Sequence, residues 1–216
     1  MKARVILLVP GQAASNPIES GPFLSGGRLV DTPSVRRMVL EALQGFPAVK
    51  GITAVLLDPS CIGEDGKVEG LESVDSIIPL PESGVWTRAS LLEAVCSQTS
   101  GEEELLWWAW ADCPLLDPDL AERMYQRHVR WHAEYTNADG WPAGFAAELV
   151  NRATLAALAW IAREDQSPVD RDLLFQVVQK DINSFDIETE ISSIDLRSRR
   201  LSFYADSRRN WLLIER

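Results

Sequence analysis

Apolar residues along this chain form short, almost unbroken runs separated by polar and helical segments. Three such runs predict strands with both faces buried: 5–9, 52–57 and 105–111. Segments with helical spacing or helix-capping residues follow them at 33–44, 87–97 and 118–132. Because strands alternate with helices, the pattern predicts an α/β fold in three α/β/α layers, with a Rossmann-like and mostly parallel sheet.

The remaining predicted elements are shorter, and the loops between them are rich in glycine, proline and polar residues. The predicted loops are 11–27, 58–72 and 137–145. We expect further strands at 76–80, 185–191 and 201–205, and further helices at 152–163, 170–179 and 207–216. The 216 residues are expected to form one domain, 1–216, which is either a whole protein or one part of a longer polypeptide.

Charge and cysteine content narrow the classes of protein that fit this pattern. The formal net charge of −11 argues against nucleic-acid binding, because a phosphate backbone requires a basic surface. The 3 cysteines lack CxxC spacing, which favours reduced thiols. The apolar run at the amino terminus is too short for a signal peptide, and no stretch is long enough to span a membrane. We therefore expect a cytoplasmic protein that binds neither nucleic acid nor membranes.

Two aspartates directly follow apolar runs that predict strands. Asp112 comes after 105–111, and Asp206 comes after 201–205. The carboxyl ends of parallel strands meet at one edge of the sheet, where open α/β sheets bind their ligands. Two carboxylates, together with water and substrate phosphates, are enough to hold Mg²⁺. The spacing therefore predicts Asp112 and Asp206 as metal ligands, with the alternative that each caps the element that follows it.

Four other residues carry chemistry that the pattern alone does not assign to a site. His128 and His132 share a helix face, but no third metal ligand is evident, and solvent-facing histidines are expected. Cys113 has no histidine base beside it and is expected to be a small buried residue in a turn. Trp141, in the glycine-rich loop, either stacks on a base or sugar or packs as part of a lid.

Three segments resemble one family of enzymes. ADCPLLDPDLAERM, residues 111–124, resembles the G-D-C-P-L-[IL]-D-P-E motif of the cytidylyltransferases of the spore-coat polysaccharide and CMP-sugar synthetase group. SGGRLVDTPSVRRMVLEAL, residues 25–43, is similar to that family's diglycine and I-R-R helix. LSFYADSRRNWLLIE, residues 201–215, is similar to its closing R-L-T-V-D-T-P-E-D-L-E element. The likeness spans most of the chain in the correct order.

The resemblance implies a sheet of the nucleotide-diphospho-sugar transferase type and a specific reaction. That reaction is Mg²⁺-dependent transfer of a nucleotide from CTP, or another NTP, to a sugar-type acceptor. By this likeness, Asp112 and Asp206 are the catalytic residues and hold the metal. The remaining implied residues bind nucleotide (Pro10, Gly11 and Arg28) or line the acceptor pocket (Gly140, Trp141, Gly144 and Glu148).

A second likeness opens an alternative function. Residues 137–158 and 182–213 resemble the nucleotidyltransferase-like domain that precedes the iron–sulfur domain of spirochaete-type radical-SAM/SPASM proteins. In addition, the loop 11–27 has no lysine or arginine, whereas the family's first loop grips the triphosphate with cations. The alternative is therefore a degenerate, catalytically inactive binding or docking domain for a radical-SAM partner. Family analogues also lead us to consider a homodimer.

Overall fold

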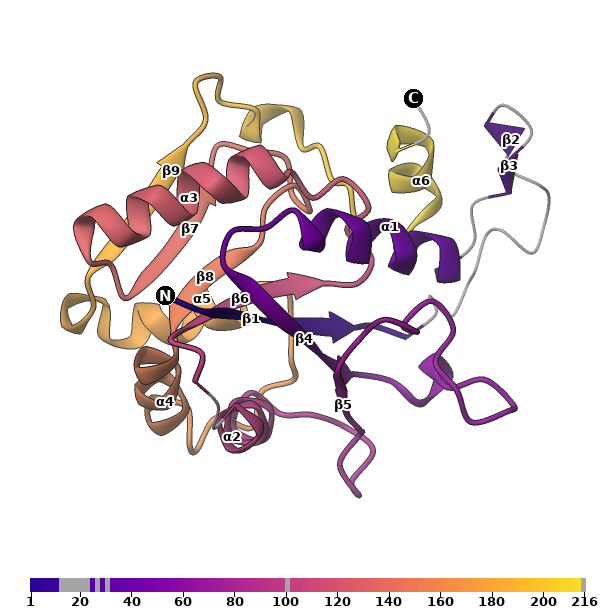
Figure 1. Cartoon of the computed structure of the whole chain (residues 1–216), viewed down its shortest axis with the longest axis horizontal. Helices are drawn as coiled ribbons and strands as arrows, with labels where there is room; N and C mark the ends of the chain where they lie inside the picture. The colour runs from indigo at the N-terminus through magenta and orange to yellow at the C-terminus, as the bar shows by residue number, and fades with distance from the viewer. Residues whose placement is uncertain (12–23, 26–27, 30–31, 100–101, 215–216) are drawn as a thin grey trace.

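The structure is a computed structural model that describes residues 1–11, 24–25, 28–29, 32–99 and 102–214. Its main feature is a seven-stranded sheet with the order β5-β4-β1-β6-β8-β7-β9 (Figure 1). The strands, in that order, are Ser76–Ile78, Val49–Leu56, Ala3–Val9, Leu105–Trp110, Glu148–Asn151, Tyr135–Asp139 and Ile187–Ile191. Strand β8 pairs antiparallel with β6 and with β7, and the other pairings in this sheet are parallel. The predicted α/β fold with a mostly parallel sheet is confirmed.

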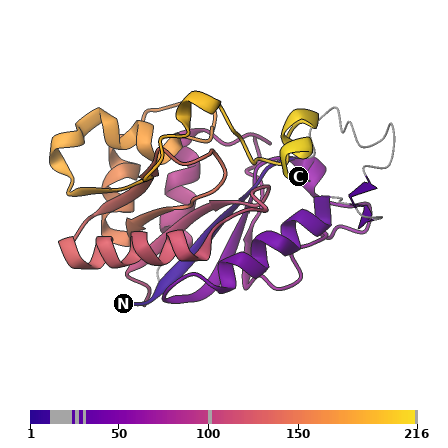
Figure 2. The same cartoon turned by 90° about the horizontal axis from the view of Figure 1, so that it is seen from above.

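Helices cover both faces of the sheet, which explains why its central strands are apolar on both sides (Figure 2). Helices α1 (Thr32–Gln44) and α3 (Pro118–Trp131) lie on one face. The other face carries α2 (Arg88–Gln98), α4 (Arg152–Ile161) and α5 (Leu173–Val178). The shorter elements are β2 (Leu24–Ser25), β3 (Arg28–Leu29), α6 (Arg208–Ile214) and the 3₁₀ turns η2 (Pro59–Cys61), η3 (Gln179–Ser184) and η4 (Arg197–Arg199). Among these described helices, none is long and apolar enough to cross a lipid bilayer.

Strand β6 forms the centre of the hydrophobic core. All six of its residues are buried, and it pairs along its length with β1, which is also almost wholly buried. The Trp107 ring packs edge-on against Phe46, with 5.0 Å between ring centroids. Its indole N–H donates to the Pro47 carbonyl at 3.2 Å, so this large side chain is buried with its polar atom satisfied.

Several elements differ from the sequence prediction, and the strand β8 lies where no strand was predicted. Residues 201–205 are not a strand, because this segment makes a single bridge, from Ser202 to Ala143, and runs along a loop instead of a sheet edge. The predicted loop 137–145 begins inside β7, because parallel pairing with β9 extends that strand as far as Asp139. The predicted helix 170–179 begins only at Leu173, and the residues before it form a turn.

We expect Gly144→Ala to destabilise the fold by about 1 kcal/mol more than Gly84→Ala, as measured by urea unfolding. Both glycines have a positive φ, +82° at Gly144 and +74° at Gly84, so both substitutions introduce backbone strain. A Cβ at Gly144 would also lie 3.0 Å from the Phe203 carbonyl carbon, whereas nothing lies within 4 Å of one at Gly84. Equal losses would show that close packing of residue 203 on this loop contributes nothing to stability.

Candidate functional site

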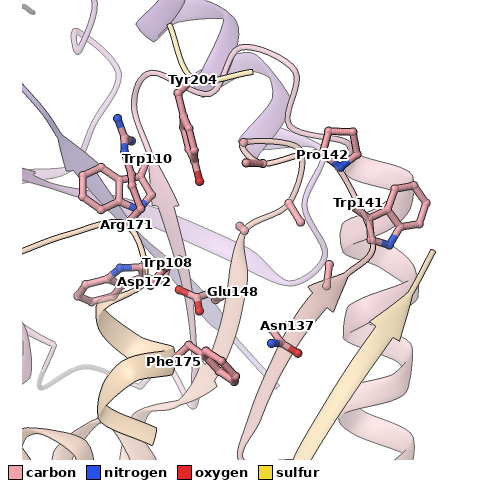
Figure 3. Close-up of a pocket in the computed structure, with 15 residues that line it drawn as sticks. Trp108, Trp110, Asn137, Trp141, Pro142, Glu148, Arg171, Asp172, Phe175 and Tyr204 are labelled. Atoms are coloured by element: carbon pink, nitrogen blue, oxygen red, sulfur yellow. The ribbon is translucent and has the colours of Figure 1, made fainter. Parts of the chain in front are cut away.

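A cavity of about 230 Å³ lies where β6 and β7 end and β8 begins (Figure 3). Its position matches the edge at which open α/β sheets bind ligands. The residues that line it come from these three strands, from the loop 141–147, from the turn and first residues of α5, and from the carboxyl-terminal segment. They are Trp108, Trp110, Asn137, Ala138, Trp141, Pro142, Ala143, Gly144, Ala146, Ala147, Glu148, Arg171, Asp172, Phe175 and Tyr204.

Aromatic rings form much of the cavity wall. Trp108 and Trp110 lie on one side of the cavity, Trp141 lies across from them, and Tyr204 and Phe175 lie at its two ends (Figure 3). The Trp108 side chain is almost fully buried, yet its indole N–H has no hydrogen-bond partner within the described residues. Because a buried unpaired donor is costly, this N–H on the wall marks a place for an acceptor atom of a ligand.

Glu148 places a carboxyl group inside the cavity. Strand β8 runs antiparallel between β6 and β7, so its first residue, Glu148, lies opposite Trp108 at the edge where the other two strands end. The Tyr135 hydroxyl donates a hydrogen bond to Glu148 Oε1. Burial raises the pKa of Glu148 to about 7, the Tyr135 hydrogen bond opposes the rise, and the negative charge of Asp172 adds to it. This carboxyl group therefore changes charge near neutral pH.

Asp112 and Asp206, which were predicted to converge, both lie close to the guanidinium of Arg171. Arg171 donates from Nη1 to Asp112 Oδ1 at 2.7 Å and from Nη2 to Asp112 Oδ2 at 2.5 Å. The same Nη2 is 3.7 Å from Asp206 Oδ2. Asp206 reaches this position because the Ala205 N–H donates to the Asp112 carbonyl at 2.7 Å. The segment 201–205 thus delivers Asp206 to the site although it is not a strand.

Aromatic rings hold the Arg171 guanidinium in place. Its Cζ lies 4.2 Å from the centroid of the Trp110 ring and 4.1 Å from that of Tyr204. Burial disfavours the charged guanidinium, but the hydrogen bonds and charge of Asp112 outweigh that effect and raise the pKa of Arg171. A bidentate pair of this kind, stacked on aromatic faces, uses the planar geometry that arginine has and lysine lacks.

This arrangement does not fit a divalent cation. Both Asp112 oxygens accept hydrogen bonds from Arg171, and the same guanidinium lies 3.7 Å from Asp206 Oδ2. A metal between the two carboxylates would have to displace a positive group that is already bonded there. Within the described part of the chain, no group of three or more His, Cys, Asp or Glu side chains is placed to hold a metal ion.

Two of the three predicted nucleotide-binding residues lie at this same sheet edge, because β1, which they follow, pairs with β6. Pro10 and Gly11 follow β1, and a Cβ at Gly11 would come within 2.5 Å of the Asp58 side chain, so the chain approaches that carboxylate closely here. Arg28 belongs to β3, but its side chain and most of the loop 11–27 lie outside the described residues. Their predicted role in nucleotide binding stays a prediction.

Arg36, on α1, is a buried cation that is electrostatically coupled to Asp112. Its Nη1 donates to the Glu69 carbonyl at 2.9 Å, and its Nη2 has no partner within the described residues. Burial lowers the pKa of Arg36, while the charges of Cys61, Glu69 and Asp112 oppose that shift.

Three of the four predicted acceptor residues, Trp141, Gly144 and Glu148, line the cavity. Gly140 does not, and a Cβ there would instead approach Ser192 at 3.2 Å. The Trp141 ring stacks on Phe145 with 6.0 Å between centroids and donates from Nε1 to the Glu190 carbonyl. It is therefore fixed by the protein while it lines the cavity, and its predicted contact with a ligand stays untested.

The histidine prediction was wrong for His128. This residue is buried on α3, and its ring nitrogens bond to Thr136 Oγ1 at 2.8 Å and Asn151 Oδ1 at 3.0 Å. Burial lowers its pKa. His132, in contrast, is exposed at the carboxyl end of that helix, as expected. Cys113 is buried beside Asp112, as predicted, and burial raises its pKa well above the usual range.

Sequence reasoning missed Arg171 and the cavity role of Trp108. Arg171 lies in a turn between two aspartates, a pattern typical of an ordinary solvated segment, and it is 59 residues from Asp112. Trp108 lies in a strand predicted to be buried on both faces, a pattern that favours a role in the core. Trp108 and Trp107 are both buried, and they differ because consecutive strand residues point to opposite faces of the sheet, of which the Trp108 face borders the cavity.

No protein-family model matches the sequence, and neither does the sequence of any curated protein. Solved structures do match. A cytidylyltransferase from Leptospira borgpetersenii serovar Hardjo-bovis has a TM-score of 0.72 and 15% identity, covering 100% of this chain and 85% of that chain. The 4-diphosphocytidyl-2C-methyl-D-erythritol synthase of Anaerococcus prevotii has a TM-score of 0.65 and 12% identity, with 99% and 95% covered.

A third match, the Rv0371c protein of Mycobacterium tuberculosis in complex with manganese, has a TM-score of 0.57 and 12% identity, with 97% and 98% covered. At these identities the likeness concerns the fold and not the activity. The predicted sheet of the nucleotide-diphospho-sugar transferase type is confirmed: the chain has the fold of the nucleotidyltransferases, cytidylyltransferases among them.

Proposed function

We propose that this chain is a binding domain with a nucleotidyltransferase-like fold, which holds a small sugar-type molecule in the cavity lined by Trp108 and Glu148. The observation that carries the proposal is a wall of aromatic rings that includes Trp108, whose buried N–H has no partner among the described residues. Aromatic faces pack against the C–H faces of a sugar ring, and polar groups bind its hydroxyls. A sugar hydroxyl facing Trp108 supplies the acceptor that the indole lacks.

The charges in the cavity favour a neutral or amine-bearing sugar over a sugar acid. Glu148 and Asp172 both line the cavity and carry acidic groups. Arg171 is the cation among the described lining residues, and its charge is already engaged by Asp112. A ligand carboxylate would therefore meet uncompensated negative charge, whereas an amine would gain from that charge and from the aromatic faces.

The partner of such a binding domain is a separate proposal. The sequence likeness to spirochaete-type proteins points to a radical-SAM domain, attached to this chain or separate from it. Mixing the chain with such a domain in analytical ultracentrifugation tests this partnership, and the same measurement on the chain alone tests the homodimer.

Glucose and glucosamine are expected to bind more tightly than glucuronate, as measured by calorimetry with tryptophan fluorescence as a second signal. Trp108→Phe keeps the ring but removes the N–H, so the affinity for the best sugar should fall about five-fold, corresponding to about 1 kcal/mol. Trp160→Phe is the matched control, because Trp160 is 68% exposed on α4 and does not line this cavity. Absence of binding by all three sugars at millimolar concentration would contradict the proposal.

A second candidate function is Mg²⁺-dependent cytidylyl transfer from CTP. It is favoured by the convergence of Asp112 and Asp206 on one guanidinium and by Arg36 Nη2, which has no partner among the described residues. We expect no pyrophosphate release when the protein is incubated with CTP, Mg²⁺ and the three sugars, because Arg171 engages both carboxylates. Steady turnover that is abolished by Asp112→Asn would establish the transferase instead of the binding domain.

The stability of the wild type relative to Glu148→Gln should fall as the pH rises from about 4.5 to about 7. The folded protein raises the pKa of Glu148 from 4.5 to about 7. The folded state therefore binds this proton more tightly than the unfolded state does, and the advantage is lost as the pH rises through that window. Above it the buried carboxylate costs roughly 3 kcal/mol, which the variant avoids.

Urea unfolding at several pH values measures this difference. Glu82→Gln, which removes an exposed carboxylate, controls for the change in net charge. A constant difference between wild type and Glu148→Gln across this pH range would show that Glu148 does not titrate within it.

A further inference from the structure

We propose that the Arg171 guanidinium is a built-in substitute for a divalent cation, and that the site at Asp112 and Asp206 excludes metal ions for as long as this side chain is present. The inference is independent of the sugar-binding proposal. It concerns the carboxylate pair at the sheet edge, whatever the neighbouring cavity binds.

The first argument is occupancy. Asp112 is almost fully buried, and each of its two oxygens already accepts a hydrogen bond from Arg171. Asp206 is more exposed, with 41% of its side chain accessible, and its Oδ2 faces the same Nη2 at 3.7 Å. Asp206 Oδ1 accepts from the Asn210 side chain at 2.8 Å. Three of the four carboxylate oxygens are therefore held by donors at hydrogen-bonding distance, and the fourth faces a guanidinium nitrogen.

The second argument is charge. Two carboxylates and one guanidinium leave a net charge of −1 at this place, close to neutrality, without any ion from solution. A divalent cation must therefore compete with a cation that is tethered to the chain and does not dissociate.

The third argument is that Arg171 is fixed and not merely nearby. Its guanidinium lies over the Trp110 and Tyr204 rings, and only 25% of its side chain is exposed. Moving it aside would break a bidentate ion pair and two cation–π contacts together. Arg171 also lines the cavity, so it is a positioning residue that connects the carboxylate pair to the cavity wall.

The test is binding of Mn²⁺ to the full chain, followed by electron paramagnetic resonance and calorimetry. We expect only weak binding by the wild type, unchanged in Asp206→Asn. Arg171→Met keeps an unbranched stem beside Trp110 but removes the charge, so Mn²⁺ affinity should increase at least ten-fold. The double variant Arg171→Met/Asp206→Asn should lose that gain, which locates the new ion at this pair.

Two outcomes would overturn the inference. One is tight Mn²⁺ binding by the wild type that Asp206→Asn abolishes. The other is an Arg171→Met protein that keeps its circular dichroism spectrum and gains no Mn²⁺ affinity. If Arg171→Met fails to fold, the Mn²⁺ affinities of the wild type and of Asp206→Asn are compared instead. Asp206→Asn leaves the Asp112–Arg171 pair intact, and a large loss of affinity in this variant would overturn the inference. None of these readouts involves a sugar, so they stand apart from the binding measurements.

Discussion

The ion pair between Asp112 and Arg171 is the interaction on which the candidate site depends. Asp112 ends the most buried strand of the sheet, and Arg171 belongs to the turn that begins α5. The Asp112 carbonyl also accepts from the Ala205 N–H, so the same residue anchors the carboxyl-terminal segment. Three parts of the chain that are distant in sequence therefore meet at one residue, Asp112. Removal of either charged partner would leave the other buried without compensation.

The aromatic content of β6 contributes to the core and to the cavity in alternation. Trp107 faces Phe46 and is enclosed, whereas Trp108 and Trp110 reach the cavity. The difference follows from strand geometry, because successive side chains point to opposite faces of the sheet, and β8 pairs with β6 only as far as Trp108. Where β8 stops pairing with β6, a space remains that the loop 141–147 and Tyr204 border but do not fill.

The sequence predicted the α/β fold, but it did not predict the ion pair between Asp112 and Arg171. In β1, β4 and β6 the residues that face either side of the sheet are apolar. Such runs identify buried parallel strands, because strands with one exposed face alternate apolar and polar residues. The proximity of Asp112 and Asp206 was expected because residues that follow parallel strands meet at one edge of the sheet. The segment before Asp206 is nevertheless not a strand. Arg171 could not be predicted, because a long-range ion pair leaves no periodic signal in one sequence. His128 was misassigned for the same reason, since its partners lie on β7 and β8.

The reversed direction of β8 also affects the order in which the molecule can assemble during synthesis. The parallel strands β1, β4 and β6 with their helices are complete once about half of the chain has left the ribosome. The cavity, in contrast, requires Glu148, Arg171 and finally Tyr204. Its last wall requires Tyr204, which is synthesised after the core strands β1, β4 and β6. The cavity is consequently completed later than the pairing partners at the centre of the sheet are synthesised.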